Sequence, residues 1–354
     1  MLKLIDLFSG VGGLSRGFEM AGFEPNLAIE FDTQIAESYA HNNPRSRVLN
    51  ADISDINIQS EFRGVRGNDS IVVGGPPCQG FSQKGKRLGL NDERNFLIRQ
   101  YLEVVAFIQP LAVVIENVPG ILSSESGFFL KQIENMLRSN GYLVQHRILN
   151  AVDYGVPQLR TRAFIIGIKK IKGLKSFQWP TPNIRPTTVE EAISDLPILK
   201  SGEGRSPVKF QACANSNFQS LMHDREDGLL FNHIATNHSK TVLERLAMIP
   251  ENGGRESLPS EHLTKSIYSG TWTRLRSNKP ARTITTRFDT PSSGMFTLPT
   301  QDRCLTVREA ARLQSFPDSF EFLGNKSNQM LQVGNAVPPL LAKAIANSIA
   351  EVIP

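Results

Sequence analysis

The stretch that most constrains this chain is the segment 73–82, with the sequence VGGPPCQGFS. It follows the apolar residues 70–73, which predict a buried parallel strand. Two consecutive glycines let a ligand or another backbone approach closely, and the two prolines fix φ. A cysteine that only fills a core needs neither this stiff backbone nor a polar flank. We therefore interpret Cys78 as a nucleophile presented at the carboxyl end of a strand.

The size and composition of the chain limit its class. Its 354 residues exceed the roughly 250 to 300 at which single cores stop growing, so we expect two domains. Residues 1–6 run directly into a predicted strand, without a signal peptide or a membrane-spanning stretch, so we expect a soluble cytosolic protein with no membrane partner. Cys78, Cys213 and Cys304 lack metal-ligand spacing, and we expect neither disulfides nor a metal. The net charge of +5 suits a polyanionic partner.

A glycine-rich loop follows the first predicted strand, residues 2–8. The sequence SGVGG, residues 9–13, precedes a predicted helix, and this order cradles a nucleotide-like ligand on helix N-terminal amides. Two later predicted strands end near Glu30 and Asp52, and two acids at successive strand ends indicate an adenosine site. The glycine register departs from the dinucleotide pattern, so we favour a mononucleoside over NAD.

Two further segments carry candidate catalytic groups. The apolar residues 111–115 predict a strand that delivers Glu116 to the same edge as Cys78, partly desolvated, so that its pKa rises and it can carry a proton. The segment 158–162 places Arg160 and Arg162 two residues apart in extended chain, where side chains point the same way. We expect the two arginines to act together on an anion or a carbonyl, or one of them to be purely structural.

The loop after Cys78 and the second half of the chain are basic. Glycines in segment 83–91 allow motion, and its cations could clamp phosphate; the alternative is a solvated loop. Past residue 175 the periodicity weakens and prolines mark a less regular second domain. Residues 262–288 contain no acid, and their six cations interleave with two aromatic residues, which favours a nucleic-acid surface over a solvated face. Those cations are Lys265, Arg274, Arg276, Lys279, Arg282 and Arg287.

Local signals also place three helices in the second half. Thr188 with Glu191, and Thr306 with Glu309, form capping boxes, which open a short helix and a helix through residue 313. The last helix follows Pro338 and has one apolar face, which needs a core to bury against. We infer that this last segment returns to the first domain.

Six blocks, in order, resemble the DNA (cytosine-5)-methyltransferase family of bacterial restriction–modification type over nearly the whole chain. The blocks are DLFSGVGG (6–13), GPPCQGFS (75–82), ENV (116–118), QLRTR (158–162), PARTIT (280–285) and GNAVPP (334–339). The resemblance implies an α/β fold, namely a Rossmann-like S-adenosylmethionine-dependent methyltransferase with a mostly parallel sheet. It also implies a catalytic domain of residues 1–178 and 330–354, and a smaller, irregular target-recognition domain of residues 179–329.

The resemblance further implies roles for the catalytic residues. Cys78 matches the nucleophile that adds to C6 of cytosine, Glu116 the residue that holds N3, and Arg162, beside Arg160, the arginine at O2. The methyl group passes from S-adenosylmethionine to C5, leaving S-adenosylhomocysteine. Because C6 is inaccessible inside a duplex, base flipping is implied.

Residues for the donor and for DNA carry over from the same blocks. The implied donor site comprises Phe8, Gly10, Gly12, Gly13, Leu14, Glu30, Phe31, Asp52, Ile53, Pro76, Asn335 and Ala336. The expected DNA contacts are Gln79, Ser82, Lys84, Lys86, Arg87, Arg274, Arg276, Arg282 and Thr285.

These expectations define a partner and leave alternatives. The partner is double-stranded DNA, and the expected enzyme is a monomer in the bacterial cytoplasm, associated with the nucleoid through DNA. It protects DNA from a cognate restriction endonuclease that shares its site without needing to bind it. The alternative is methylation of cytosine in tRNA, against which the long segment between Gln158 and Pro280 argues. A dehydrogenase leaves the Cys78 loop unexplained, and a non-catalytic DNA-binding module would lack Cys78 or Glu116.

Overall fold

The computed structural model describes residues 2–77, 95–182, 185–210, 213–265 and 269–353. They form two compact units. Unit 1 comprises Met1–Asn150, Thr161–Pro182 and Pro339–Pro354, and unit 2 comprises Ala151–Arg160 and Asn183–Pro338. No helix among the described residues is long and apolar enough to cross a membrane.

Unit 1 is built on a seven-stranded sheet in the order β3-β2-β1-β4-β5-β8-β6. β8 runs antiparallel to both of its neighbours, and the other pairs are parallel. The α/β fold with a mostly parallel sheet is therefore confirmed. The strands are β1 (Lys3–Leu7), β2 (Glu24–Glu30), β3 (Arg47–Asn50), β4 (Ser70–Gly74), β5 (Ala112–Asn117), β6 (Tyr142–Asn150) and β8 (Thr161–Lys169).

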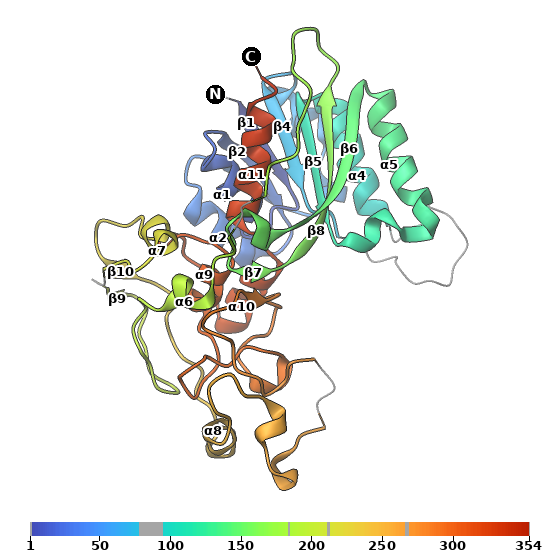
Figure 1. The fold of residues 1–354 in the computed structure, drawn as a ribbon. Coiled ribbons are helices and arrows are strands. Elements are labelled where there is room, and N and C mark those ends of the chain that lie inside the picture. Colours follow the sequence, from blue (N-terminus) through green and yellow to red (C-terminus); the bar gives the residue numbers. More distant parts are fainter. Residues whose placement is uncertain (1, 78–94, 183–184, 211–212, 266–268, 354) are drawn as a thin grey trace. The chain divides into compact units, whose positions relative to one another are not determined.

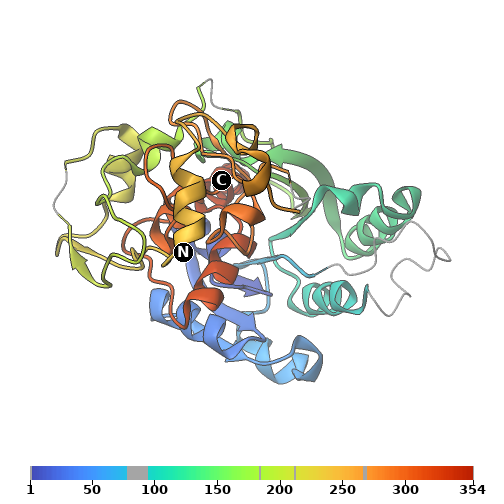
Figure 2. The same ribbon diagram turned by 90° about the horizontal axis from the view of Figure 1, so that it is seen from below.

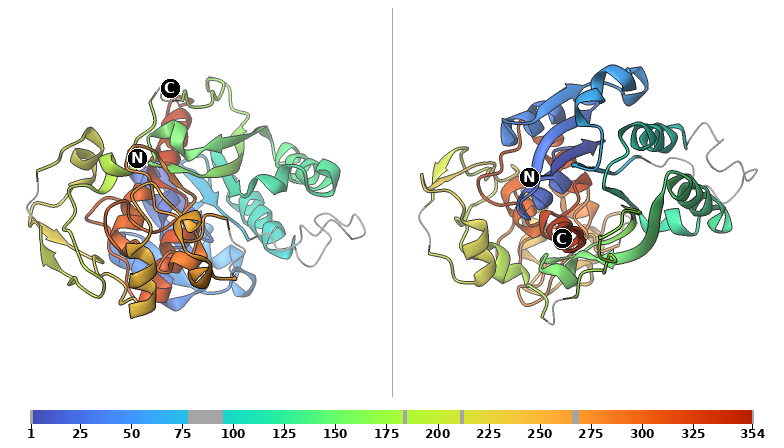
Figure 3. Two further views of the ribbon diagram at one scale, coloured as in Figure 1. Left: turned by 60° about the horizontal axis from the view of Figure 1, so that its bottom comes forward. Right: turned by 90° about the horizontal axis from the view of Figure 1, so that it is seen from above.

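Helices cover both faces of this sheet. Ile5 and Leu7 of β1 belong to a buried cluster with residues of α4 and α5, such as Tyr101 and Ile133. Figure 3 shows these two helices side by side, in teal and green. The helices of unit 1 are α1 (Gly13–Glu19), α2 (Thr33–Asn42), α3 (Ile58–Glu61), α4 (Phe96–Ile108), α5 (Phe128–Ser139) and α11 (Pro339–Ala350).

The last helix, α11, packs against α1 within unit 1 (Figure 1). Leu341, Ile345, Ile349 and Val352 are each at most 2% exposed. The prediction that the end of the chain returns to the first domain is confirmed. Contact is so close at Gly17 of α1 that a Cβ there would overlap the Pro339 carbonyl oxygen and the Ala342 side chain.

Unit 2 consists mainly of loops joined by short elements (Figure 2). Both predicted capping boxes are confirmed, Thr188 with Glu191 and Thr306 with Glu309. Its strands are β7 (Gln158–Leu159), β9 (Val208–Lys209), β10 (Leu229–Leu230) and β11 (Ala281–Arg282). Its helices are α6 (Val189–Ile193), α7 (Asn217–Met222), α8 (Lys240–Ala247), α9 (Val307–Leu313) and α10 (Lys326–Asn335).

The boundaries of the two units differ from the expected positions at residues 178 and 330. Residues 151–160 and 330–338 belong to unit 2. The cause is pairing between segments far apart in the chain: β7 pairs with β11, and Arg160 donates to the Gly334 carbonyl. A boundary read from proline content could not show these long-range bonds.

We expect Gly17→Ala to lower the free energy of unfolding by about 1–3 kcal/mol, because the added methyl overlaps α11. In an open helix the same change would stabilise by roughly 0.5–1 kcal/mol. Gly64→Ala is the matched control, since nothing lies within 4 Å of a Cβ there. Urea unfolding of both variants checks this, and a Gly17→Ala protein as stable as the wild type would contradict it.

Candidate active site

The loop between β1 and α1 is shaped by left-handed backbone. Phe8, Gly10 and Gly12 have φ of 61°, 54° and 97°. At Gly12 a Cβ would lie 2.9 Å from the Tyr39 ring, so only glycine fits there without displacement. The N-cap of α1, Gly12, has no side-chain hydrogen bond, which leaves the first amides of the helix available to a ligand.

Glu30 joins this loop to the end of β2. Its Oε2 accepts from the Gly10 amide and its Oε1 from the Asp32 amide, both at 2.9 Å. Burial raises the pKa of Glu30, against the lowering effect of these two amide bonds. Each carboxylate oxygen has a second lone pair, so the group can still accept from a ligand hydroxyl.

The ends of β2 and β3 supply the other predicted adenosine contacts. Phe31 is 72% exposed, which leaves a ring face open for stacking. The Oδ1 of Asp52 accepts from the backbone N–H and hydroxyl of Ser54, and the backbone bond is the largest cause of its lowered pKa. Ile53 is 3% exposed and packs in the unit 1 core.

The backbone that leads to Cys78 is held against the end of β5. A Cβ on Gly75 would lie 3.0 Å from Oε2 of Glu116, and Asn117 donates through Nδ2 to the Pro76 carbonyl at 2.9 Å. The chain therefore passes beside Glu116 directly before the predicted nucleophile. Cys78, Gln79, Ser82, Lys84, Lys86 and Arg87 lie outside the described residues.

Glu116 and Arg162 form an ion pair. Arg162 Nε lies 2.8 Å from Glu116 Oε1, and the two side chains are 17% and 11% exposed. They come from β8 and β5, neighbouring antiparallel strands in which Glu116 pairs with Phe164. A nearly buried pair of opposite charge fixes the carboxylate and leaves its other oxygen facing the Gly75 loop.

Arg160 differs from Arg162 in its surroundings, and the expectation that both act at the site is corrected. Arg160 is 1% exposed and donates to the Ile284 and Gly334 carbonyls, at 3.0 and 2.8 Å, all within unit 2. The side chain thus holds two segments of unit 2 together. Arg160 lies between β7 and β8, whereas Arg162 belongs to β8, so their spacing in the sequence does not give them a shared environment.

One expected DNA contact, Arg274, is also structural. It is 4% exposed, donates to the Leu246 and Ile249 carbonyls at the end of α8, and pairs with Asp302. Arginine is the side chain best suited to such a fork of bonds, and charge alone in a sequence does not reveal burial. Arg276, Arg282 and Thr285 are exposed, and their contact with DNA stays a prediction.

Asn335 and Ala336 belong to unit 2, so their place in the donor site stays a prediction. Sequence reasoning missed a buried group in unit 1. Asp6 is 1% exposed and accepts from the Ser15 hydroxyl at 2.7 Å, and the Ser15 and Tyr39 hydroxyls are 2.7 Å apart. An aspartate between the apolar residues Ile5 and Leu7 of β1 was the available signal.

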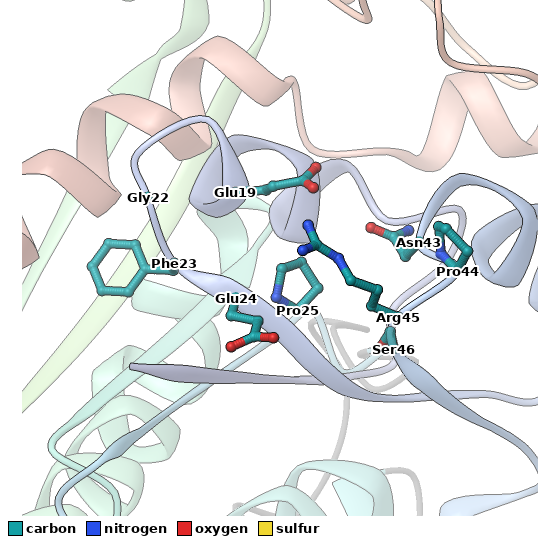
Figure 4. A pocket seen from close by; sticks show the side chains of 9 residues that line it. All are labelled: Glu19, Gly22, Phe23, Glu24, Pro25, Asn43, Pro44, Arg45 and Ser46. Carbon is teal, nitrogen blue, oxygen red and sulfur yellow. The ribbon is translucent and has the colours of Figure 1, made fainter. Parts of the chain in front are cut away.

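A pocket of about 430 Å³ lies away from the edge of the sheet at which the carboxyl ends of the parallel strands meet (Figure 4). Its lining includes Glu19, Glu24 and Arg45, beside the amino ends of β2 and β3. Since the candidate residues follow the carboxyl ends of the strands, this pocket does not serve them. Within the described ranges, no group of three His, Cys, Asp or Glu side chains could hold a metal ion.

Comparison with known proteins gives consistent matches over the whole chain. Residues 2–351 match the family model described as C-5 cytosine-specific DNA methylase. The type II methyltransferase M1.HphI of Haemophilus parahaemolyticus is 38% identical, over 98% of this chain and 86% of its own length. The type II methyltransferase M.DdeI of Desulfomicrobium norvegicum is 37% identical, over 98% of this chain and 88% of its own length. A crystal structure described as a DNA modification methyltransferase encoded within an E. coli prophage is 32% identical, with a TM-score of 0.80 and coverage of 100% and 99%.

Arg274→Ala should lower the free energy of unfolding by about 2–5 kcal/mol, because it leaves several buried carbonyls without a donor. Arg276→Ala, two residues away and exposed, should change it by less than about 0.5 kcal/mol. Thermal and urea unfolding of the two variants measure the difference. Equal stabilities would show that Arg274 does not hold α8.

Asp6 should make stability depend on pH. Burial raises its pKa from 3.8 to about 7, so the folded protein keeps this proton to a higher pH than the unfolded chain. The contribution of Asp6 to the free energy of unfolding is greatest below about pH 4. It falls as the pH rises to about 7 and is constant above about pH 7. Between about pH 5.5 and about pH 8 the free energy of unfolding should fall by about 2 kcal/mol more in the wild type than in Asp6→Asn. Urea unfolding at both pH values measures this, and parallel losses would contradict it.

Proposed function

The chain belongs to the C-5 cytosine-specific DNA methylase family, and from this premise we propose how it carries out that reaction. It is a DNA (cytosine-5)-methyltransferase of the type II restriction–modification class. The proposed reaction moves a methyl group from S-adenosylmethionine to C5 of a cytosine within a specific duplex sequence. The cytosine is flipped out of the helix and attacked at C6 by Cys78.

The residues of unit 1 fit S-adenosylmethionine. The uncapped N-terminus of α1, the free lone pairs of Glu30 and the exposed ring of Phe31 offer amides, a hydroxyl acceptor and a stacking face. When bound, the donor supplies an activated methyl group on a sulfonium. The residues of unit 1 that would hold it are Phe8, Gly10, Gly12, Gly13, Leu14, Glu30, Phe31, Asp52, Ile53 and Pro76.

The observation that carries the proposal is the Glu116–Arg162 pair beside the Gly75 loop. The Cys78 thiolate adds to C6 of cytosine, and Glu116 supplies the proton that N3 gains as the ring becomes an enamine. Arg162 donates to O2 of the base and holds the Glu116 carboxyl at the ring edge. After C5 is methylated, a base takes the C5 proton, the C5–C6 double bond re-forms, and the C6–S bond breaks to release the thiolate. N3 returns its proton to Glu116.

Unit 1 supplies the catalytic domain in this proposal, and unit 2 the target-recognition domain. Exposed Arg276 and Arg282 suit phosphate contacts, together with the loop cations after Cys78. The enzyme acts as a monomer on double-stranded DNA in the bacterial cytoplasm, near the nucleoid. Its product is resistant to a restriction endonuclease of the same specificity.

Incubation of the protein with labelled S-adenosylmethionine and unmethylated duplexes of varied sequence tests this function. We expect label in 5-methylcytosine of DNA at one sequence, and none in tRNA. Label in tRNA alone, or in no nucleic acid, would overturn the proposal.

Cys78→Ser should lower methyl transfer at least about 10³-fold, because the hydroxyl is a far weaker nucleophile than a thiolate. Donor binding, measured by calorimetry, should stay unchanged. Cys213→Ser is the matched control, since Cys213 is an exposed free cysteine of unit 2. Full activity of Cys78→Ser would remove Cys78 from the mechanism.

A further inference from the structure

The Asp6 carboxyl group is buried and has no counterion among the residues that the structure describes. Its Oδ2 accepts from Ser15, while its Oδ1 is buried and, within the described part of the chain, has no hydrogen-bond partner. The described residues form no ion pair with it. A buried carboxylate normally has a cationic partner or several donors, because removing a charge from water costs several kcal/mol.

Asp6 lies directly behind the loop of residues 9–13, the proposed donor loop. Its backbone pairs with Ala28 of β2 and Val73 of β4, so it sits in the centre of the parallel sheet. Ser15 is in the first turn of α1, and the Tyr39 ring that contacts Ser15 also lies beneath Gly12. The chain of three side chains therefore connects β1, α1 and α2 under the segment 9–13.

The groups that face Asp6 are hydroxyls and another acid. Ser15 of α1 donates to Asp6, and the Tyr39 hydroxyl of α2 bonds to Ser15. Tyr101 of α4 has its pKa raised by burial and by the Asp6 charge. Glu30 of β2 is the charged neighbour, and each carboxyl is disfavoured as an anion by burial. Among the described residues, the acids Asp6 and Glu30 therefore lie next to the loop of residues 9–13 without a cation that balances them.

We propose that the Asp6 carboxylate, together with Glu30, makes the donor loop select the positively charged sulfonium donor over its neutral thioether product. This inference rests on the proposed use of S-adenosylmethionine. The donor carries one more positive charge than S-adenosylhomocysteine, and apart from the methyl group on sulfur the two molecules are identical. Charges interact strongly where the surroundings are dry, so a buried anion distinguishes them without touching either. Product release after each turnover is favoured by the same difference.

The selectivity follows the ionisation of Asp6. Burial raises its pKa to about 7, so the anion forms as the pH passes through neutrality. The ratio of donor affinity to product affinity should therefore rise between about pH 6 and about pH 8. Donor binding near neutrality should also release a fraction of a proton, whereas product binding should not.

Isothermal calorimetry with the full-length protein tests this. The ligands are S-adenosylmethionine, S-adenosylhomocysteine and sinefungin, in which a carbon bearing an amine replaces the sulfonium. Titration in two buffers of different ionisation heat gives the proton release. We expect Asp6→Asn to weaken the two cationic ligands about five- to tenfold, to leave the product within about twofold, and to abolish the proton release. Asp32→Asn is the matched control, because it removes a half-buried acid at the same edge while Asn still caps α2.

The outcomes are separable. Equal weakening of all three ligands by Asp6→Asn would show that Asp6 only supports the loop, and would overturn the inference. The pH dependence of the wild-type affinity ratio needs no variant, so a flat ratio would overturn it even if Asp6→Asn does not fold. If the wild-type protein binds none of the three ligands, the proposed function itself fails.

Discussion

The meeting of the carboxyl ends of β1, β2, β3, β4 and β5 at one edge of the sheet is the constraint on which the rest of unit 1 depends. Parallel strands place the residue after each strand near its neighbours, whatever their separation in the chain. The Gly loop, Glu30, Asp52, the Gly75 loop and Glu116 are brought together in this way. The close contact of Gly75 with Glu116, and the bond from Asn117 to Pro76, then fix the chain that enters the nucleophile loop.

Charge is distributed unevenly around that edge. Glu116 has Arg162 as a partner, so the pair can present a fixed carboxyl to a base. Among the described residues, Asp6 and Glu30 accept hydrogen bonds from a hydroxyl and from backbone amides, and burial raises the pKa of both carboxyls. The two halves of the site thus differ in electrostatics as the proposed chemistry requires: a paired acid for the pyrimidine and an uncompensated negative region for a cation.

Arginine is the residue for which the sequence was least informative. Arg160, Arg162 and Arg274 lie in or near the family blocks, and their neighbouring residues in the sequence are similar. Arg162 binds an acid, Arg160 holds backbone carbonyls of unit 2, and Arg274 caps α8. Glycine was more informative, because positive φ at Gly10 and Gly12, and the lack of room at Gly12 and Gly75, restrict those positions to glycine or nearly so. A backbone requirement of this kind depends on neighbouring residues, whereas the partner of an arginine side chain can come from a distant part of the sequence.

The sequence by itself determined β1, β2, β3, β4 and β5, both capping boxes, the return of the last helix and the family, because periodicity, capping and motif blocks are properties of neighbouring residues. The tertiary structure alone decided which arginines are buried, that residues 151–160 and 330–338 pack with unit 2, and that Asp6 has no counterion in the described chain. Each of these depends on groups far apart in the chain, and burial is set by what packs around a side chain rather than by its own chemistry.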